Sequence, residues 1–327
     1  MARREQQLDD GGKLAALLFR RLGDSLLATP ALRSLKQSFP KSTVQVICER
    51  HVSRVFEHLD YVDDVTVVSG SPGIKELVQA IRSNVRSSVA TVDFLSDPRT
   101  SLASLISGAT VRVGIAKSWR RFAYTRAVSV QDIVRPEYSA IHKLRLAESL
   151  GAGSVDCMPD FRLDEESIEN AERIMKSLVS RDEGIVSIYV TSRRDYKKWP
   201  MEKFKQVVHT IRSGYRIALV GAVSEYDDIA QFCDYARIER NAITLFTDLG
   251  EFGAFLQKCI LFVGNDGGPK HLATAVGTPT VGIFQNDPWE YWTPPNSNRH
   301  LGVGGRGVTP EVSDVMDAIH VVLSSNA

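Results

Sequence analysis

The sequence predicts an α/β protein made of two Rossmann-like halves whose parallel sheets face each other across a cleft. Short apolar runs of strand length alternate with helical apolar patterns along almost the whole chain, and this alternation is typical of βαβ units and parallel sheets. The alternation stops at the Gly- and Pro-bearing segment Gly151–Pro159 and restarts with a long helical pattern at Asp164–Val179. A chain of 327 residues is long enough for two domains. We therefore expect domains over residues 1–160 and 161–327.

The first half opens with an apolar run that predicts a buried strand and then repeats the strand and helix pattern. The expected strands are Leu14–Phe19, Val44–Cys48, Val65–Val68, Val89–Asp93 and Val111–Val113, and the expected helices are Ser25–Phe39, a stretch near Val52–Leu59, Ile74–Ser83 and Ser101–Ser107.

The second half repeats the pattern and ends in a helix over 311–324 that can pack back on the first half. In paired halves of this kind, ligands usually bind at the carboxyl ends of the strands. The expected strands are Ile185–Tyr189, Ile217–Val220, Ala242–Leu245, Ile260–Val263 and Thr280–Phe284, and the expected helices are Asp164–Val179, Met201–Ile211, Glu225–Tyr235, Glu251–Lys258 and Pro269–Val276.

Composition limits the class of protein. A hydrophobic content of 43% and a charged content of 24% are those of a soluble globular protein. The net charge of +1 gives no general attraction to nucleic acid or membranes. Four scattered cysteines without a Cys-x-x-Cys pair predict buried thiols in a reducing cytoplasm. The polar start Met1–Gly12 is expected to be disordered, and the apolar run after it is too short for a signal core or a membrane span. Any membrane contact is therefore expected to be peripheral.

The most informative segment is Gly264–Ala273, which lies between a predicted strand and a predicted helix. Asp266 is a suitable N-cap, and Pro269 suits a first helical turn. Glycines let the backbone approach a ligand, free N–H groups at a helix start attract anions, and Lys270 and His271 add donors. The segment predicts either a phosphate pocket or an ordinary strand-to-helix turn.

Two further segments of the second half carry polar groups after a strand. Thr191–Pro200 holds two hydroxyls, Thr191 and Ser192, with four basic side chains. Such groups either contact diphosphate oxygens or form a solvated basic loop. Glu225 follows another strand, where an acid either accepts hydrogen bonds from ribose hydroxyls or caps a helix.

Asp24 follows the first strand of the chain, within Arg21–Ser25. Its side chain is either an N-cap or a carboxylate available as a general base. Only one glycine lies in this turn, and the chain has no Walker lysine loop. The sequence thus disfavours nicotinamide-dependent enzymes and P-loop NTPases.

The stretch Pro98–Gln131 contains no acidic residue. It predicts either an anionic partner or a solvated basic loop. Nucleic acid is not expected, because no nucleic-acid motif accompanies the charge, whereas a phosphorylated glycolipid fits the mixture of basic and aromatic groups. The basic residues are Arg99, Arg112, Lys117, Arg120, Arg121 and Arg126, and the aromatic ones are Trp119, Phe122 and Tyr124.

Three motifs together resemble the heptosyltransferase-like glycosyltransferases of family 9, which have the GT-B fold. They are Arg21–Leu32, Lys197–Pro200, and Asn265–Ala273 with its continuation Gly277–Thr280. The resemblance extends roughly from Lys13 to Leu323. It implies an inverting transfer of a sugar, typically heptose from ADP-heptose, onto a lipopolysaccharide core or another anionic lipid-linked saccharide.

The resemblance also implies roles for individual residues. Asp24 would be the catalytic base, and Lys197 would contact the donor diphosphate in a mechanism without a metal or other cofactor. The acid-free stretch, and not the resemblance, places acceptor binding in the first domain, at Arg112, Lys117, Arg120, Arg121 and Arg126. The second domain would bind the donor through Thr191, Ser192, Lys198, Glu225, Asp266, Gly267, Gly268, Lys270 and His271. The enzyme would be cytoplasmic and peripheral at the inner face of the inner membrane.

The chain departs from the family pattern in one loop. Phe284–Asp287 reads Phe-Gln-Asn-Asp where the family often has Phe-Gly-Pro-Thr, so the donor sugar stays open. The double lysine also allows Lys198 to share the role of Lys197. Two other functions remain: a sugar-nucleotide epimerase of the same fold, and a sugar-nucleotide-binding protein without catalytic activity.

Overall fold

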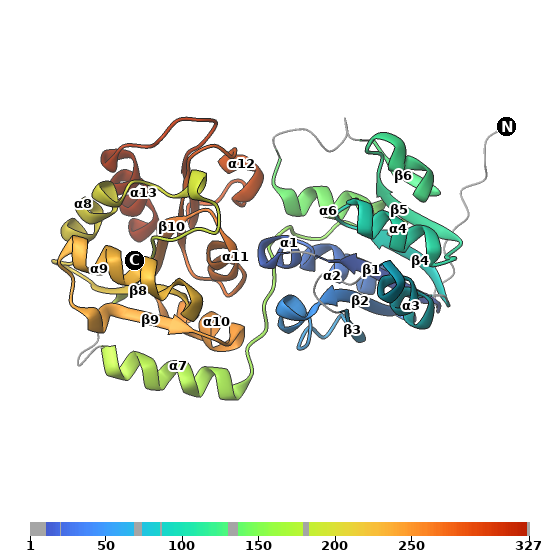
Figure 1. Cartoon of the computed structure of the whole chain (residues 1–327), viewed down its shortest axis with the longest axis horizontal. Coiled ribbons are helices and arrows are strands. Elements are labelled where there is room, and N and C mark those ends of the chain that lie inside the picture. Colours follow the sequence, from blue (N-terminus) through green and yellow to red (C-terminus); the bar gives the residue numbers. More distant parts are fainter. Residues whose placement is uncertain are drawn as a thin grey trace. The chain divides into compact units, whose positions relative to one another are not determined.

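The computed structural model describes residues 11–19, 21–68, 74–85, 87–129, 137–178 and 183–325. Most of the polar start and the end of the acid-free stretch, residues 130 and 131, lie outside these ranges. The chain divides into two compact units, Met1–Asp160 and Phe161–Ala327. Each unit has its own parallel sheet with helices packed on it, as the predicted α/β class requires (Figure 1).

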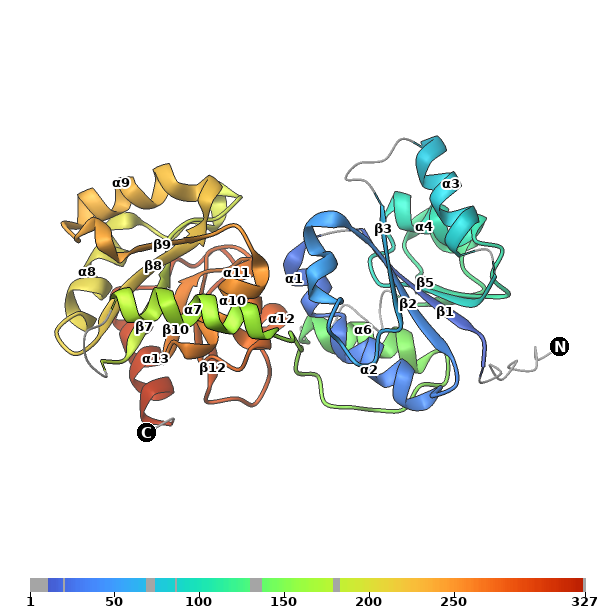
Figure 2. The same cartoon turned by 90° about the horizontal axis from the view of Figure 1, so that it is seen from below.

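The sheet of the first unit has six parallel strands in the order β3-β2-β1-β4-β5-β6. The chain reverses its direction of travel across the sheet between β1 and β4, which is the position where α/β sheets usually bind ligands. Helix α2 packs on α6, and α3 packs on α4 (Figure 2). The strands are β1 Lys13–Leu18, β2 Thr43–Glu49, β3 Asp64–Val68, β4 Ser88–Asp93, β5 Val111–Ile115 and β6 Arg126–Val128; the helices are α1 Leu22–Leu26, α2 Thr29–Ser38, η1 Arg50–Val55, α3 Ile74–Asn84, α4 Pro98–Ile106, η2 Ser118–Ala123 and α6 Ser139–Glu148.

The sheet of the second unit also has six parallel strands, in the order β12-β11-β10-β7-β8-β9. Helices α8, α9 and α13 bury their apolar sides in one cluster with β7, β8, β10 and β11, while α7 packs on α10 (Figure 1). The strands are β7 Ile185–Tyr189, β8 Arg216–Ala222, β9 Ile243–Phe246, β10 Leu261–Asn265, β11 Thr280–Phe284 and β12 His300–Gly304; the helices are α7 Glu165–Leu178, η3 Asp195–Lys197, α8 Met201–Ile211, η4 Val223–Glu225, α9 Tyr226–Ala236, η5 Arg240–Ala242, α10 Leu249–Lys258, α11 Gly268–Ala275, α12 Trp289–Trp292 and α13 Val312–Ser324.

The single helix predicted over Ser25–Phe39 is two helices in the structure. Helix α1 ends at Leu26, and α2 begins at Thr29 with Pro30 in its first turn. Proline has no N–H to continue the helical ladder, and the Thr29 hydroxyl donates to the Leu26 carbonyl at 2.7 Å. The break places α1, which carries Asp24, on a short segment of its own after β1.

The last helix, α13, lies over the sheet of the second unit. Its buried residues Val315, Ile319 and Val322 belong to the apolar cluster of that unit, and its neighbours there include α8, β11 and β12. Within the described ranges, no helix has both the length and the apolar character needed to span a bilayer.

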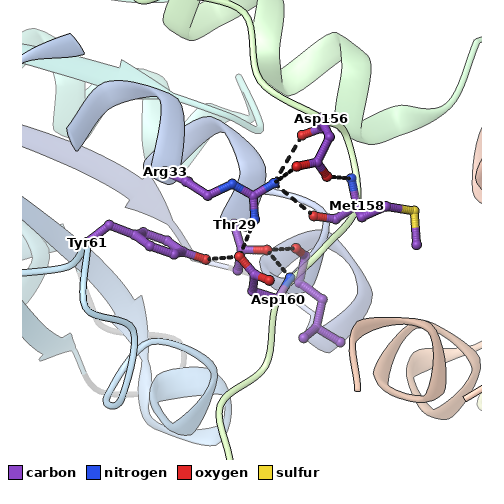
Figure 3. Close-up of polar contacts among 7 residues, drawn as sticks. Thr29, Arg33, Tyr61, Asp156, Met158 and Asp160 are labelled. Carbon is purple, nitrogen blue, oxygen red and sulfur yellow. Dashed lines mark hydrogen bonds and ion pairs between the residues drawn. The ribbon is translucent and has the colours of Figure 1, made fainter. Parts of the chain in front are cut away.

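The end of the first unit is fastened to α2 by a cluster of polar contacts (Figure 3). Arg33 forms an ion pair with Asp160 and a second one with Asp156 at 3.0 Å. The Tyr61 hydroxyl donates to Asp160 Oδ2 at 2.8 Å, and the Asp160 N–H donates to Thr29 Oγ1 at 2.8 Å. The segment before the second unit is therefore anchored to α2, which directly follows α1, the helix that carries Asp24.

Candidate active site

Asn265 at the end of β10 joins two loops of the second unit through its side chain. Its Oδ1 accepts a hydrogen bond from the Trp199 N–H at 2.9 Å. Its Nδ2 donates to the Val190 carbonyl at 2.8 Å and to the Thr191 carbonyl at 3.2 Å. Asn265 is fully buried, so one amide sets where the loop after β7 lies relative to the end of β10.

Lys197 lies between two carboxylates at this end of the sheet. Its Nζ is 2.5 Å from Asp266 Oδ2 and 2.7 Å from Asp287 Oδ2. Burial by itself lowers the pKa of Lys197, but the two carboxylates outweigh burial and raise it. The ammonium therefore stays charged over the physiological pH range.

The predicted N-cap role of Asp266 is wrong. The N-cap of α11 is Gly267, and no side chain caps this helix. The Asp266 carboxylate instead pairs with Lys197 and lies 3.8 Å from His271 Nε2. The Asp266 carboxylate thus pairs with Lys197, which is 69 residues away in the chain, and does not cap the helix next to it.

The side chain of Trp292 on α12 lies against this group. Its ring packs edge-on against the His271 ring at a centroid distance of 5.7 Å. Lys197 Nζ lies 5.8 Å from the centroid of the same ring. The Trp292 side chain thus closes one side of the group formed by Lys197 and His271.

Lys270 is a fully buried lysine. Its Nζ donates to the Trp292 carbonyl and lies 5.2 Å from the Phe284 ring centroid. Burial lowers the pKa of Lys270 to about 8, although Asp266 opposes this change. A Cβ at Gly282 would lie 2.8 Å from Lys270 Cδ, so the glycine in β11 makes room for the lysine stem.

The motif glycines have separate structural reasons. A Cβ at Gly264 would lie 2.5 Å from the Tyr189 carbonyl oxygen, so β10 needs glycine there to pair closely with β7. Gly267 has extended backbone angles that any residue can adopt. A Cβ at Gly267 would lie 3.3 Å from the Tyr189 ring. The first N–H groups of α11, which begins at Gly268, remain available to an anion.

Glu225 makes a capping contact and also accepts hydrogen bonds from two side-chain hydroxyls. Its Oε2 accepts from the Ala222 N–H at 2.9 Å, which is a capping contact. Its Oε1 accepts from the Tyr189 hydroxyl at 2.8 Å and from the Thr191 hydroxyl. Glu225 Oε1 therefore faces the end of β7, beside the loop that carries Lys197.

The two remaining residues of the predicted donor loop have local partners. Lys198 pairs with Asp228 at 3.0 Å and with Asp195 at 3.1 Å. Ser192 Oγ accepts from the Arg194 N–H at 3.4 Å. Lys197 and Lys198 thus pair with different carboxylates, and only Lys197 contacts Asp266.

Asp24 in the first unit lies in the first turn of α1, directly after β1. The N-cap of this helix is Arg21, so Asp24 is not the cap. Lys143 Nζ lies 3.6 Å from Asp24 Oδ1 and donates to Ser139 Oγ at 3.0 Å. The Asp24 side chain is 24% exposed, so solvent reaches a carboxylate whose charge a buried lysine stabilises.

Lys117, which follows β5, shares the electrostatic environment of Asp24. Burial lowers the pKa of Lys117 most, Arg120 and Lys143 lower it further, and Asp93 and Asp24 oppose them. The Arg120 Nε donates to the Ser96 carbonyl at 3.2 Å. Lys117 and Arg120 therefore lie at the carboxyl edge of the sheet with Asp24.

The other predicted acceptor residues have different positions. Arg112, the second residue of β5, donates to the Ala123 and Ala109 carbonyls, both at 2.8 Å. Arg126, the first residue of β6, donates to the Ser149 carbonyl at 2.8 Å. Both lie toward the amino ends of their strands, away from Asp24, whereas Arg121 on η2 is exposed.

Sequence reasoning missed several polar residues near these groups. Asp93 ends β4 and is completely buried, and burial raises its pKa to about 6. It accepts from the Tyr124 hydroxyl and the Ser96 N–H, both at 2.7 Å. The sequence did hold a signal for Asp93, because an acidic residue at the end of a central strand often lies in a site. Lys143 lies on α6, a helix that is not among the expected ones, so no signal pointed to it.

Comparison with known proteins decides the family. Residues 97–318, more than half of the chain, match the family described as "Glycosyltransferase family 9 (heptosyltransferase)". The chain belongs to glycosyltransferase family 9. The resemblance that its three motifs predict is confirmed, and so is the transferase class.

Relatives of this family 9 protein include curated and solved bacterial proteins. It is 25% identical over 297 residues to lipopolysaccharide heptosyltransferase 3 of Escherichia coli strain K12, covering 84% of this chain and 83% of that one. A family 9 glycosyltransferase from Veillonella parvula has a TM-score of 0.84 at 18% identity, covering 97% and 98% of the two chains. The E. coli ADP-heptose LPS heptosyltransferase II has a TM-score of 0.76 at 15% identity, covering 96% and 100%. These solved structures confirm the GT-B fold of the family 9 chain.

Proposed function

We propose that this family 9 enzyme transfers heptose from ADP-heptose to a lipopolysaccharide core, with inversion at the anomeric carbon. Family membership and the names of two E. coli relatives, lipopolysaccharide heptosyltransferase 3 and ADP-heptose LPS heptosyltransferase II, support this activity. The observation that carries the proposal is the group formed by Lys197, Asp266 and His271 at the start of α11.

The second unit would bind the donor. The diphosphate would lie at the first N–H groups of α11 and on the Lys197 ammonium, because both stabilise negative charge. Glu225, whose Oε1 already accepts two hydroxyls, would accept ribose hydroxyls. Thr191 and His271 border the same end of the sheet and would contact the phosphates or the sugar.

The first unit would bind the acceptor and remove its proton. Asp24 takes the proton of an acceptor hydroxyl, and that oxygen forms a bond to the anomeric carbon. The bond from the anomeric carbon to the diphosphate oxygen breaks, and its electron pair leaves with the nucleoside diphosphate. The transition state resembles an oxocarbenium ion, and Lys197 stabilises the charge of the leaving group.

We propose that no metal ion takes part in this step. Lys197 and the start of α11 supply the positive charge that a cation supplies elsewhere. Among the described residues, no group of three or more His, Cys, Asp or Glu side chains is arranged to hold a metal. Transfer should keep its full rate in EDTA, and a loss that Mg²⁺ restores would contradict this part of the proposal.

The acceptor is proposed to be an anionic, lipid-linked saccharide at the cytoplasmic face of the inner membrane. Lys117 interacts electrostatically with both Asp24 and Arg120 in the same unit. Arg120 also borders a cavity of about 170 Å³ between α4 and η2, lined by apolar side chains that include Leu102 and Phe122. Phe122 is 60% exposed, so apolar and cationic groups occur together on this surface, as peripheral contact with an anionic bilayer requires.

The proposed function can be tested with three measurements on the purified enzyme. ADP should raise the melting temperature more than UDP or GDP does, because a ligand that binds only the folded state stabilises it. Asp24→Asn should lose most of the transfer activity and keep ADP binding. Near-normal transfer by correctly folded Asp24→Asn would show that Asp24 is not the base. Incubation with donor alone separates transfer from epimerisation, since only an epimerase changes the sugar without an acceptor.

A further inference from the structure

Two carboxylates compete for Lys197, and they are held very differently. The Asp266 side chain is 5% exposed, while that of Asp287 is 32% exposed. The Asp266 N–H also donates to the Ile283 carbonyl at 3.1 Å, which fixes the backbone at the end of β10. Asp266 is therefore a permanent partner of Lys197, and the Asp287 side chain is the one with room to move.

The backbone around Asp287 is nevertheless firmly placed. The Asn286 side chain donates to the Tyr196 carbonyl at 2.9 Å, next to Lys197 in the chain. The Arg306 N–H donates to the Asn286 carbonyl at 3.0 Å, and the Gly307 N–H donates to the Gln285 carbonyl at 2.9 Å. The loop after β11 thus holds the Asp287 side chain at Lys197, so the ion pair follows from how the loop is built.

This arrangement conflicts with simple binding of a diphosphate at Lys197. One ammonium faces two carboxylates, so these three groups together carry a net negative charge. A diphosphate that takes Lys197 as its partner would meet Asp287 at the distance of an ion pair, and like charges at that distance repel strongly. The repulsion falls if the Asp287 side chain rotates toward solvent while its backbone stays in place.

We propose that Asp287 is a displaceable counter-ion of Lys197. Its charge weakens binding of the free nucleoside diphosphate more than binding of the intact sugar nucleotide. Asp287 is thus a specificity-determining residue that favours the donor over the product. The inference rests on the proposed donor site. A free nucleoside diphosphate carries about three negative charges near neutral pH, because its terminal phosphate has a second ionisation near pH 6, whereas a sugar nucleotide carries about two. The sugar also brings hydroxyls that donate hydrogen bonds to the displaced carboxylate.

The test is calorimetric titration of ADP and of ADP-heptose into wild-type enzyme and Asp287→Asn. The amide keeps the shape of the side chain and removes its charge. The substitution should tighten ADP binding by roughly tenfold and should leave ADP-heptose binding within about twofold, so the ratio of the two dissociation constants changes. Steady-state kinetics should then show stronger inhibition by ADP with little change in the KM for the donor.

Asp228→Asn is the matched control, because it removes a carboxylate that pairs at 3.0 Å with the neighbouring Lys198. It should alter neither dissociation constant. Three outcomes for an Asp287→Asn variant that melts like wild type would overturn the inference. They are an equal effect on the binding of both ligands, no effect on either, and weaker ADP binding. If wild-type enzyme binds neither ligand, both the proposed donor site and the inference are refuted. If both ligands bind but Asp287→Asn leaves the ratio of their dissociation constants unchanged, only the inference is refuted.

Discussion

The buried Lys270 lies beside the proposed diphosphate site and should make diphosphate binding depend on pH. Lys270 Nζ is held by the Trp292 carbonyl, and burial lowers the pKa of Lys270 to about 8. Asp266 and Lys197 both interact electrostatically with this ammonium. The charge of Lys270 should therefore contribute to diphosphate binding at pH 7 and should be lost as the pH rises above 8.

The affinity for ADP should accordingly fall between pH 7 and pH 9. In Lys270→Met, which keeps an unbranched apolar stem without the charge, ADP should bind more weakly at pH 7 and its affinity should vary little over the same range. Titration calorimetry at several pH values measures both slopes. An identical slope in the two proteins would assign the pH dependence to another group.

Asp93 should make folding stability depend on pH in the opposite sense to a paired surface acid. Burial raises its pKa from 3.8 to about 6, so the folded state holds this proton more tightly than the unfolded state does. Stability should therefore fall as the pH rises through this window, by up to about 3 kcal/mol for two pKa units. Asp93→Asn should lack this contribution. Urea unfolding of both proteins at pH 4 and pH 7 measures the difference, and a parallel response would contradict the assignment.

At the residue scale, the sequence shows which side chains belong to the site better than it shows which side chains they contact. Lys197, His271 and Asp266 meet as expected from their motifs, but the partner of Asp266 is Lys197 and not the helix start. Local rules see only neighbours in the chain, and the ion pair spans 69 residues. For the same reason the contact between Lys143 and Asp24 was not predicted.

At the element scale, the segment after α6 depends on one arginine of α2. Replacing Arg33 by methionine keeps the aliphatic stem and leaves Asp160 without its ion-pair partner in a half-buried position. The expected loss is about 2 kcal/mol, typical of a charge-assisted hydrogen bond. Lys36→Met, which removes a more exposed pair with Asp63 at 2.8 Å, is the control and should cost less. Urea midpoints compare the two, and equal losses would contradict the anchoring role of Arg33.

Most strands and helices could be predicted from hydrophobic periodicity, because buried parallel strands and amphipathic helices have clear patterns. Met201–Ile211 and Ile185–Tyr189 have the predicted bounds. Two strands were missed. Arg126–Val128 is too short for a pattern, and His300–Gly304 contains two glycines, which weaken any strand signal. Both are edge strands of their sheets, where pairing with one neighbour is enough.

At the scale of the whole molecule, a net charge of +1 conceals an uneven distribution. The described part of the acid-free stretch includes the exposed Arg121 and Phe122. If this surface contacts the bilayer, binding to phosphatidylglycerol vesicles should exceed binding to phosphatidylcholine vesicles and should weaken with salt.

Charge reversal at Arg120 and Arg121 should reduce vesicle binding and use of a lipid-linked acceptor, with ADP binding unchanged. The matched control reverses two exposed arginines of the second unit, Arg212 and Arg237. Co-sedimentation with vesicles measures the effect. Equal losses in the two double variants would show that total charge, and not this surface, controls membrane contact.

The side chain of Asn265 limits how the specificity of this enzyme can evolve. Its amide accepts from Trp199 and donates to the carbonyls of Val190 and Thr191, so aspartate would place a negative charge against two carbonyl oxygens. One amide thus ties the loop between β7 and α8 to the end of β10, so a substitution at Asn265 should disturb both segments together. New donor preferences should therefore arise in the loop after β11, where Asp287 lies outside the reach of that amide.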